Sequence, residues 1–224
     1  MALTDVQQTQ FMAALPSAMP YAAGEEGRAD WHKRRDRAIL SMLLGAGVKV
    51  PELICLFTED VGVKDSTGSV PITIDPDNGI GAKKNRRGKR LPTINQTLRA
   101  HRTQLRPFAA QEVLNWVEER QASSIPGKLL FASTMAGTRM DQSTVYLLCK
   151  ATFERAGIDA VRMGPRTLRN SFAVRELESK DGSAELAGEF LVHREKKSIE
   201  PYFITKKTRD RWARAPAEKI TDKK

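Results

Sequence analysis

The sequence predicts a mainly helical protein with a small antiparallel β-sheet. Residues 143–156 place apolar side chains at positions i, i+3, i+4, i+7 and i+8, which gathers them on one face of a helix. Residues 70–74 instead alternate, with Val, Ile and Ile separated by single residues, as a strand does. Hydrophobic residues make up 40% of the 224 positions, which is enough for a proper core in one large domain or two small ones.

The first predicted helices come before this strand. Thr4 and Gln7 have the spacing of a capping box, so a helix is expected to begin there. Residues 30–44 pass from a charged start into an apolar run that is typical of a core helix, and Gly45 and Gly47 are expected to end it. A shorter helix is expected to follow, because the next proline suits a first helical turn.

Residues 61–94 are predicted to form a small hairpin or three-stranded sheet. The turn sequence Asp-Pro-Asp-Asn-Gly follows the strand at residues 75–79, and Arg-Leu-Pro-Thr-Ile at residues 90–94 closes the unit. Further helices are expected at about residues 109–121 and 143–156. The tip of the hairpin is predicted to carry six basic residues, namely Lys83, Lys84, Arg86, Arg87, Lys89 and Arg90.

The charge balance favours an anionic partner. The formal net charge is +10 and the pI is near 9.8, which provides the salt-sensitive attraction that nucleic-acid binders use. Composition alone also permits a ribosomal or membrane-surface protein, and a basic run taken alone is also typical of a solvated loop or tail. A second basic run lies near the C-terminus, with Lys206, Lys207, Arg209 and Arg211.

Targeting and cysteine patterns favour a cytoplasmic protein without a metal. No apolar run is long enough to span a bilayer, and the N-terminus lacks the basic-then-apolar layout of a secretion signal. Cys55 and Cys149 lie within apolar runs and have no Cys or His partner at zinc-site spacing. We therefore expect both to be buried thiols, and we expect no membrane contact and no metal ligands.

Three short segments in the last quarter of the chain have the composition of a phosphodiester site. Residues 166–169 read Arg-Thr-Leu-Arg, residues 191–193 read Leu-Val-His, and Tyr202 follows. Two guanidiniums on one helical turn can bind the anionic oxygens of a phosphate, and a histidine can donate a further hydrogen bond. A tyrosine hydroxyl can attack the phosphorus.

The order and spacing of these segments resemble the tyrosine recombinase (phage integrase) family, whose pattern is His-x-x-Arg, Leu-Gly-His and then a nucleophilic Tyr. Residues 35–44 resemble the first core helix of that family's catalytic domain, and residues 47–53 stand where the family has Gly-Leu-Arg-x-x-Glu-Leu. Lys84 matches the family's hairpin lysine, with Lys83 as an alternative one residue away. The resemblance begins close to Leu3.

The resemblance implies an integrase-like catalytic domain over residues 1–205, with no separate N-terminal core-binding domain, and a basic C-terminal tail over residues 206–224. It implies double-stranded DNA as the partner. A catalytic domain alone is half of the family's clamp around the duplex, so self-association on DNA or an accessory protein is expected. The implied chemistry needs no metal and no nucleotide cofactor.

The resemblance also implies a role for each matching residue. Tyr202 would attack the scissile phosphate and form a 3′-phosphotyrosyl bond, while Arg169 would stabilise charge on the non-bridging oxygens. His193 would donate a hydrogen bond to the same phosphate, and Lys84 would protonate the departing 5′ oxygen. The other hairpin cations are expected to bind DNA: Lys83, Arg86, Arg87, Lys89 and Arg90.

Two positions depart from the family pattern and leave the function open. Lys49 stands in place of the first catalytic arginine and lacks its planar fork, and Arg166 stands in place of the histidine of His-x-x-Arg. One hypothesis is a divergent recombinase that still cleaves DNA, and the other is a recombinase-fold DNA-binding regulator or accessory factor. Tyr202 could also be only a packing aromatic. A basic RNA-binding protein is disfavoured, because aromatic residues are only 6% of the chain.

Overall fold

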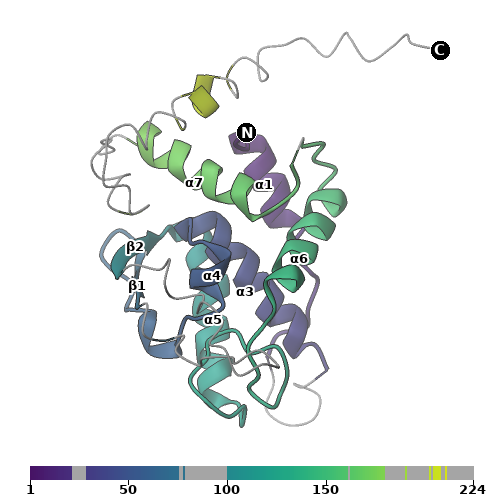
Figure 1. Ribbon diagram of the computed structural model, residues 1–224, viewed down its shortest axis with the longest axis vertical. Coiled ribbons are helices and arrows are strands. Elements are labelled where there is room, and N and C mark those ends of the chain that lie inside the picture. The colour runs from purple at the N-terminus through teal and green to yellow at the C-terminus, as the bar shows by residue number, and fades with distance from the viewer. Residues whose placement is uncertain are drawn as a thin grey trace, which may run out of the picture.

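The computed structural model confirms a mainly helical fold with an antiparallel sheet (Figure 1). The other helices pack around α3 (Trp31–Ala46), which lies at the centre of the molecule (Figure 1). No helix in the described part of the chain is long and apolar enough to cross a membrane. The structure describes residues 1–21, 29–75, 78, 100–160, 162–179, 190, 202, 204–207 and 210.

Helix α1 (Asp5–Ala13) begins at the predicted capping box. The hydroxyl of Thr4 accepts the backbone N–H of Gln7 at 3.2 Å, and the side-chain oxygen of Gln7 accepts the N–H of Thr4 at 3.0 Å. Two N–H groups at the helix start are thereby satisfied without water. Leu3 and Phe11 on this segment are fully buried, so the N-terminal residues are part of the core.

Helix α3 runs two residues further than its predicted end at residue 44. Gly45 lies inside the helix, and a Cβ added there would be 2.4 Å from the Cβ of Ala109, so the residue permits close packing against α5 (Pro107–Ala122). The prediction that Gly45 ends the helix is therefore wrong. Gly47 does end it, in the left-handed region with φ 63°, which a glycine adopts without strain.

The sheet consists of β1 (Val70–Ile74) and β2 (His101–Leu105), paired antiparallel with Val70 opposite Leu105. Strand β1 was predicted, whereas β2 was not. The hydroxyl of Thr103 donates to the carbonyl of Ala46 at 2.9 Å and fixes the sheet to the end of α3. Residues 79–99, with the predicted closing segment at 90–94 and the basic hairpin residues, lie outside the described residues.

The three helices predicted after Gly47 lie close to their predicted positions. A short helix α4 (Val50–Leu53) contains Pro51 in its first turn, and a 3-10 turn η1 (Thr58–Asp60) precedes the sheet. Helix α6 (Gln142–Arg155) buries the expected apolar face and is followed by Gly157 with φ 64°. Helix α7 (Pro165–Glu178) lies beside α1 (Figure 1).

Both cysteines are buried free thiols, as the sequence predicted. Cys55 and Cys149 are each 2% exposed or less. Burial raises the pKa of the Cys149 thiol and also that of Cys55, because a thiolate loses its hydration in an apolar interior. The two thiols are therefore unreactive packing residues in the folded protein.

Candidate active site

Helix α7 carries both arginines of the predicted phosphate-binding segment. Pro165 stands in the first turn, where its missing N–H is not needed, and Arg166 and Arg169 then lie three residues apart, on the same side of the helix. Arg166 is exposed, whereas Arg169 is 9% exposed. The helix thus presents one arginine to solvent and one at the edge of the core.

Arg169 is bonded to the turn that ends α3. Its Nη1 donates to the backbone carbonyl of Gly47, although the two residues are 122 positions apart in the sequence. A Cβ added at Gly47 would lie 2.4 Å from Cδ1 of Phe172, so the absence of a side chain lets the aromatic ring lie directly on the turn. Two contacts one helical turn apart therefore fix α7 against the Gly47 turn.

Lys49 follows two residues after the carbonyl that Arg169 binds. Its backbone N–H donates to Oε2 of Glu52 at 2.6 Å, and its Nζ lies 3.5 Å from Oε1 of the same residue. The Glu52 side chain is 1% exposed, whereas that of Lys49 is 43% exposed. The buried carboxylate thus caps α4 and holds a cation at the surface close to Arg169.

Tyr202 packs against the same helix. Phe172 and Ala173 are buried on α7, and Phe190 and Tyr202 lie against them, with the rings of Phe172 and Phe190 6.5 Å apart at 55°. Tyr202 is half-buried. Since Phe172 follows Arg169 by one helical turn, Tyr202 packs against the turn of α7 that comes after the arginine.

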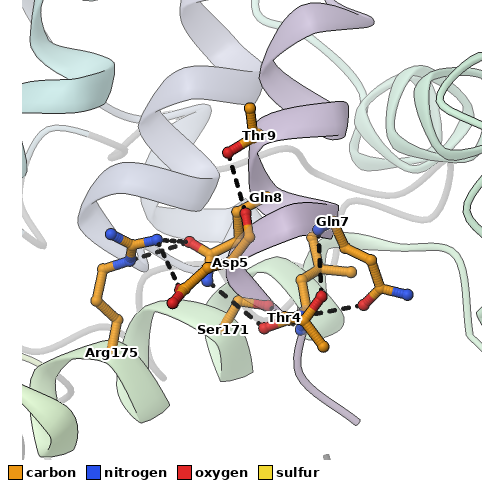
Figure 2. A network of polar contacts seen from close by, with 8 residues as sticks. Thr4, Asp5, Gln7, Gln8, Thr9, Ser171 and Arg175 are labelled. Carbon is orange, nitrogen blue, oxygen red and sulfur yellow. Dashed lines mark hydrogen bonds and ion pairs between the residues drawn. The ribbon is translucent and has the colours of Figure 1, made fainter. Parts of the chain in front are cut away.

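The N-terminal segment holds α7 from the side (Figure 2). The N–H of Leu3 donates to the buried hydroxyl of Ser171 at 2.8 Å. Arg175 donates from Nε to Oε1 of Gln8 at 3.0 Å and lies 3.5 Å from Asp5 (Figure 2). These bonds fix both the middle and the end of the helix that carries Arg169.

The structure therefore brings together part of the predicted site. Arg169, the Gly47 turn with Lys49, and Tyr202 come from three distant segments and meet around α7, with Arg166 at its exposed start. No three His, Cys, Asp or Glu side chains gather as metal ligands in the described ranges. Outside those ranges lie His193 and the hairpin residues Lys83, Lys84, Arg86, Arg87, Lys89 and Arg90.

Comparison with known proteins identifies the family. The model of the phage integrase family matches residues 6–209. The chain belongs to the phage integrase family. Within it, the tyrosine recombinase XerD of Bifidobacterium longum (strain NCC 2705) is 28% identical over 157 residues, which are 70% of this chain and 46% of that protein. This phage integrase family chain thus spans about half the length of that curated relative.

Solved structures share the fold of this phage integrase family member. The XerA recombinase is similar with a TM-score of 0.66 at 18% identity, over 95% of this chain and 63% of that one. The XerH site-specific recombinase in a post-cleavage complex with its difH substrate gives 0.66 at 20% identity, over 95% and 52%. The Tn1549 transposon integrase in complex with a circular intermediate DNA gives 0.58 at 14% identity, over 90% and 60%.

Proposed function

We propose that this chain cleaves and rejoins duplex DNA as a site-specific tyrosine recombinase, with Tyr202 as the nucleophile. The observation that supports the proposal most is the convergence on α7. Arg169 is bonded to the turn next to Lys49, and Tyr202 packs one helical turn away on Phe172. A tyrosine hydroxyl and cationic donors at one place are what attack on a phosphodiester requires.

In the proposed reaction the hydroxyl oxygen of Tyr202 attacks the scissile phosphorus. A bond forms between phosphorus and the tyrosine oxygen, whose proton passes to solvent, and the bond to the 5′ oxygen of the next nucleotide breaks. The released 5′ oxygen takes its proton from Lys84, which stands in the hairpin segment. Because the new phosphotyrosyl bond is again a phosphodiester, a 5′ hydroxyl can reverse the step without an energy source.

The cations stabilise the charge that develops on the non-bridging oxygens. Arg169 is held in place by its bond to Gly47 before DNA arrives, so little reorganisation is needed during the reaction. His193 would add a further hydrogen bond to this phosphate. Arg166 and Lys49 supply positive charge, but a guanidinium stays protonated at neutral pH and an ammonium lacks the planar fork.

A second function is supported by those two departures from the family pattern. Loss of one preorganised donor typically costs about 10²–10³ in rate, so a chain with both Lys49 and Arg166 could retain DNA affinity without measurable cleavage. The ion pair between Lys49 and Glu52, at 3.5 Å, already engages the Lys49 ammonium. The alternative is a recombinase-fold DNA-binding protein that acts as a transcriptional regulator or accessory factor of a mobile element.

The proposed partner is double-stranded DNA in the cytoplasm. The XerH relative was solved bound to its difH substrate, and the Tn1549 relative in complex with a circular intermediate DNA. These relatives, together with the net charge of +10, support a DNA site in a mobile element, to be integrated or recombined. Self-association on DNA or an accessory protein is also proposed.

A covalent-trapping experiment separates the two functions. Duplexes are first enriched from a random-sequence pool by the protein's own binding, and a nick is then placed at each position of the bound site in turn. A nick beside the cleavage point lets a short fragment diffuse away and traps the DNA on the protein. A recombinase gives an adduct on a denaturing gel that Tyr202→Phe abolishes. A regulator gives a gel shift without an adduct, and the shift is unchanged by Tyr202→Phe.

A further inference from the structure

Arg106 joins the sheet to the end of α7 through a contact that local sequence does not predict. The residue lies between β2 and α5, and its backbone N–H donates to the carbonyl of Gly45 at 2.9 Å. Its guanidinium forms a two-pronged bond with Glu176, from Nε to Oε1 at 2.7 Å and from Nη2 to Oε2. The backbone of Arg106 is thus fixed on α3 while its side chain binds α7.

Glu176 depends on this partner. Its side chain is 1% exposed, and it lies on α7 two turns beyond Arg169. A buried carboxylate without a cation would be strongly unfavourable, so the bidentate pair sets the position of this part of the helix. The Arg106 side chain is 22% exposed and already engaged by Glu176, so its charge is largely used within the protein.

The same guanidinium lies over Phe190, which belongs to the aromatic cluster that also includes Tyr202. Its Cζ is 5.8 Å from the centre of the Phe190 ring. Phe190 packs with Tyr202 on Phe172 and Ala173, and Phe172 in turn lies on the Gly47 turn. Arg106 therefore contacts both α7 and the aromatic side chain that shares its packing surface with Tyr202.

We propose that Arg106 is a positioning residue for Tyr202, which fixes the place of the tyrosine through Glu176 and Phe190 without touching DNA. The inference rests on the proposed function, in which Tyr202 attacks phosphorus. Nucleophilic attack is sensitive to displacements of about 1 Å, whereas DNA affinity comes from many phosphate contacts. Loss of the positioning contact therefore lowers the cleavage rate and leaves DNA affinity unchanged.

The test compares Arg106→Lys and Arg106→Gln with matched changes at Arg37. Arg37 forms the same kind of two-pronged pair with Glu112, at 2.8 and 2.5 Å, but it joins α3 to α5 away from α7. Arg106→Lys keeps the charge next to Glu176 and so protects folding, but it cannot hold both carboxylate oxygens and also cover Phe190. Arg106→Gln removes the charge as well.

The first measurement is single-turnover adduct formation at saturating nicked DNA, with DNA affinity measured in parallel. Displacement of the nucleophile predicts a rate loss of roughly 10- to 100-fold for Arg106→Gln. We expect a smaller loss for Arg106→Lys, while the dissociation constant stays at the wild-type value. The Arg37 variants keep the wild-type rate. A rate equal to that of the Arg37 controls, or a loss that excess DNA restores, would overturn the proposal.

The second measurement needs no cleavage. Nitration by tetranitromethane is followed at each of the three tyrosines by peptide mass spectrometry, with Tyr21 and Tyr146 as references because they are 43% and 52% exposed. In Arg106→Gln and Arg106→Lys, nitration of Tyr202 accelerates relative to both references. If wild type forms no adduct but this acceleration occurs, the proposed function fails and the positioning role stands. Unchanged nitration of Tyr202 in both variants refutes the positioning role.

Discussion

Replacement of Gly47 by alanine perturbs the contact between α3 and α7 most directly. Gly47 has φ 63°, and a Cβ there would lie 2.4 Å from Cδ1 and 2.8 Å from Cγ of Phe172. Phe172 is 1% exposed and its ring packs against that of Phe190, so the side chain is enclosed by its neighbours. The carbonyl of Gly47 also accepts the bond from Arg169, so one methyl group disturbs both contacts.

The expected loss of stability has two parts. A left-handed backbone costs an alanine about 1–2 kcal/mol, and overpacking of a filled core costs about 1–3 kcal/mol more, which together make about 2–5 kcal/mol. Gly157→Ala is the matched control, because Gly157 has φ 64° but nothing lies within 4 Å of an added Cβ. The control should lose only the backbone part, about 1–2 kcal/mol.

The assay is urea unfolding of both variants, followed by single-turnover adduct formation on nicked DNA under conditions where both are folded. We expect Gly47→Ala to lose more stability than Gly157→Ala, and its adduct rate to fall about 100-fold as Phe172 displaces Tyr202. The Gly157→Ala rate should stay at the wild-type value. Equal stability losses, or an adduct rate in Gly47→Ala that matches the control, would show that the contact between Gly47 and Phe172 does not position Tyr202.

Three further predictions concern single side chains. Lys49→Arg should raise the rate of adduct formation, because the planar fork of arginine can bind two phosphate oxygens; an unchanged or lower rate would show that Lys49 does not face the phosphate. Burial raises the pKa of the Asp60 carboxyl above its unfolded value, so the stability that this group contributes is present below about pH 4 and is lost as pH rises through the folded pKa. Urea unfolding across this range should show wild type losing stability relative to Asp60→Asn, and parallel curves would contradict the assignment. The Cys149 thiol should react with iodoacetamide only under denaturing conditions, and rapid alkylation of the native protein would show that it is not buried.

Some of the fold could be predicted because its signals are local. The capping box of Thr4 and Gln7, and the glycine at the end of α3, each need only a few neighbouring residues, and both were confirmed. The prediction for Gly45 was wrong for a tertiary reason. This glycine does not end the helix but allows α3 to pack closely against Ala109 of α5. No single-sequence pattern reports that contact.

Strand β2 was missed because its inward face is partly polar. Thr103 is 1% exposed, and the cost of burying its hydroxyl is offset by a hydrogen bond to Ala46, 57 residues away. A sequence that reads His-Arg-Thr-Gln-Leu therefore shows no alternation of apolar residues. Which residues of β2 are buried therefore depends on its contacts with β1 and α3, and not on its amino-acid composition.

The candidate site could be predicted from the sequence only through the order and spacing of its residues. The residue types at Arg169, His193 and Tyr202 suggested a phosphodiester, and in the structure Tyr202 packs against the helix that carries Arg169. It also shows that Tyr202 packs on apolar side chains, so the nucleophile and packing interpretations are compatible. Arg106 and Glu176 are 70 residues apart in the sequence, so their ion pair could not be predicted from neighbouring residues. The only local indication was an acidic residue within a buried helix.

The role of Tyr202 is tested most directly by identifying the amino acid that carries the DNA. The adduct formed on nicked duplex is digested with nuclease and trypsin, and the modified peptide is sequenced by mass spectrometry. We expect a 3′-nucleotide on Tyr202, and no adduct in Tyr202→Phe. A nucleotide on Tyr146 or Tyr21, or an adduct that persists after Tyr202→Phe, would contradict it.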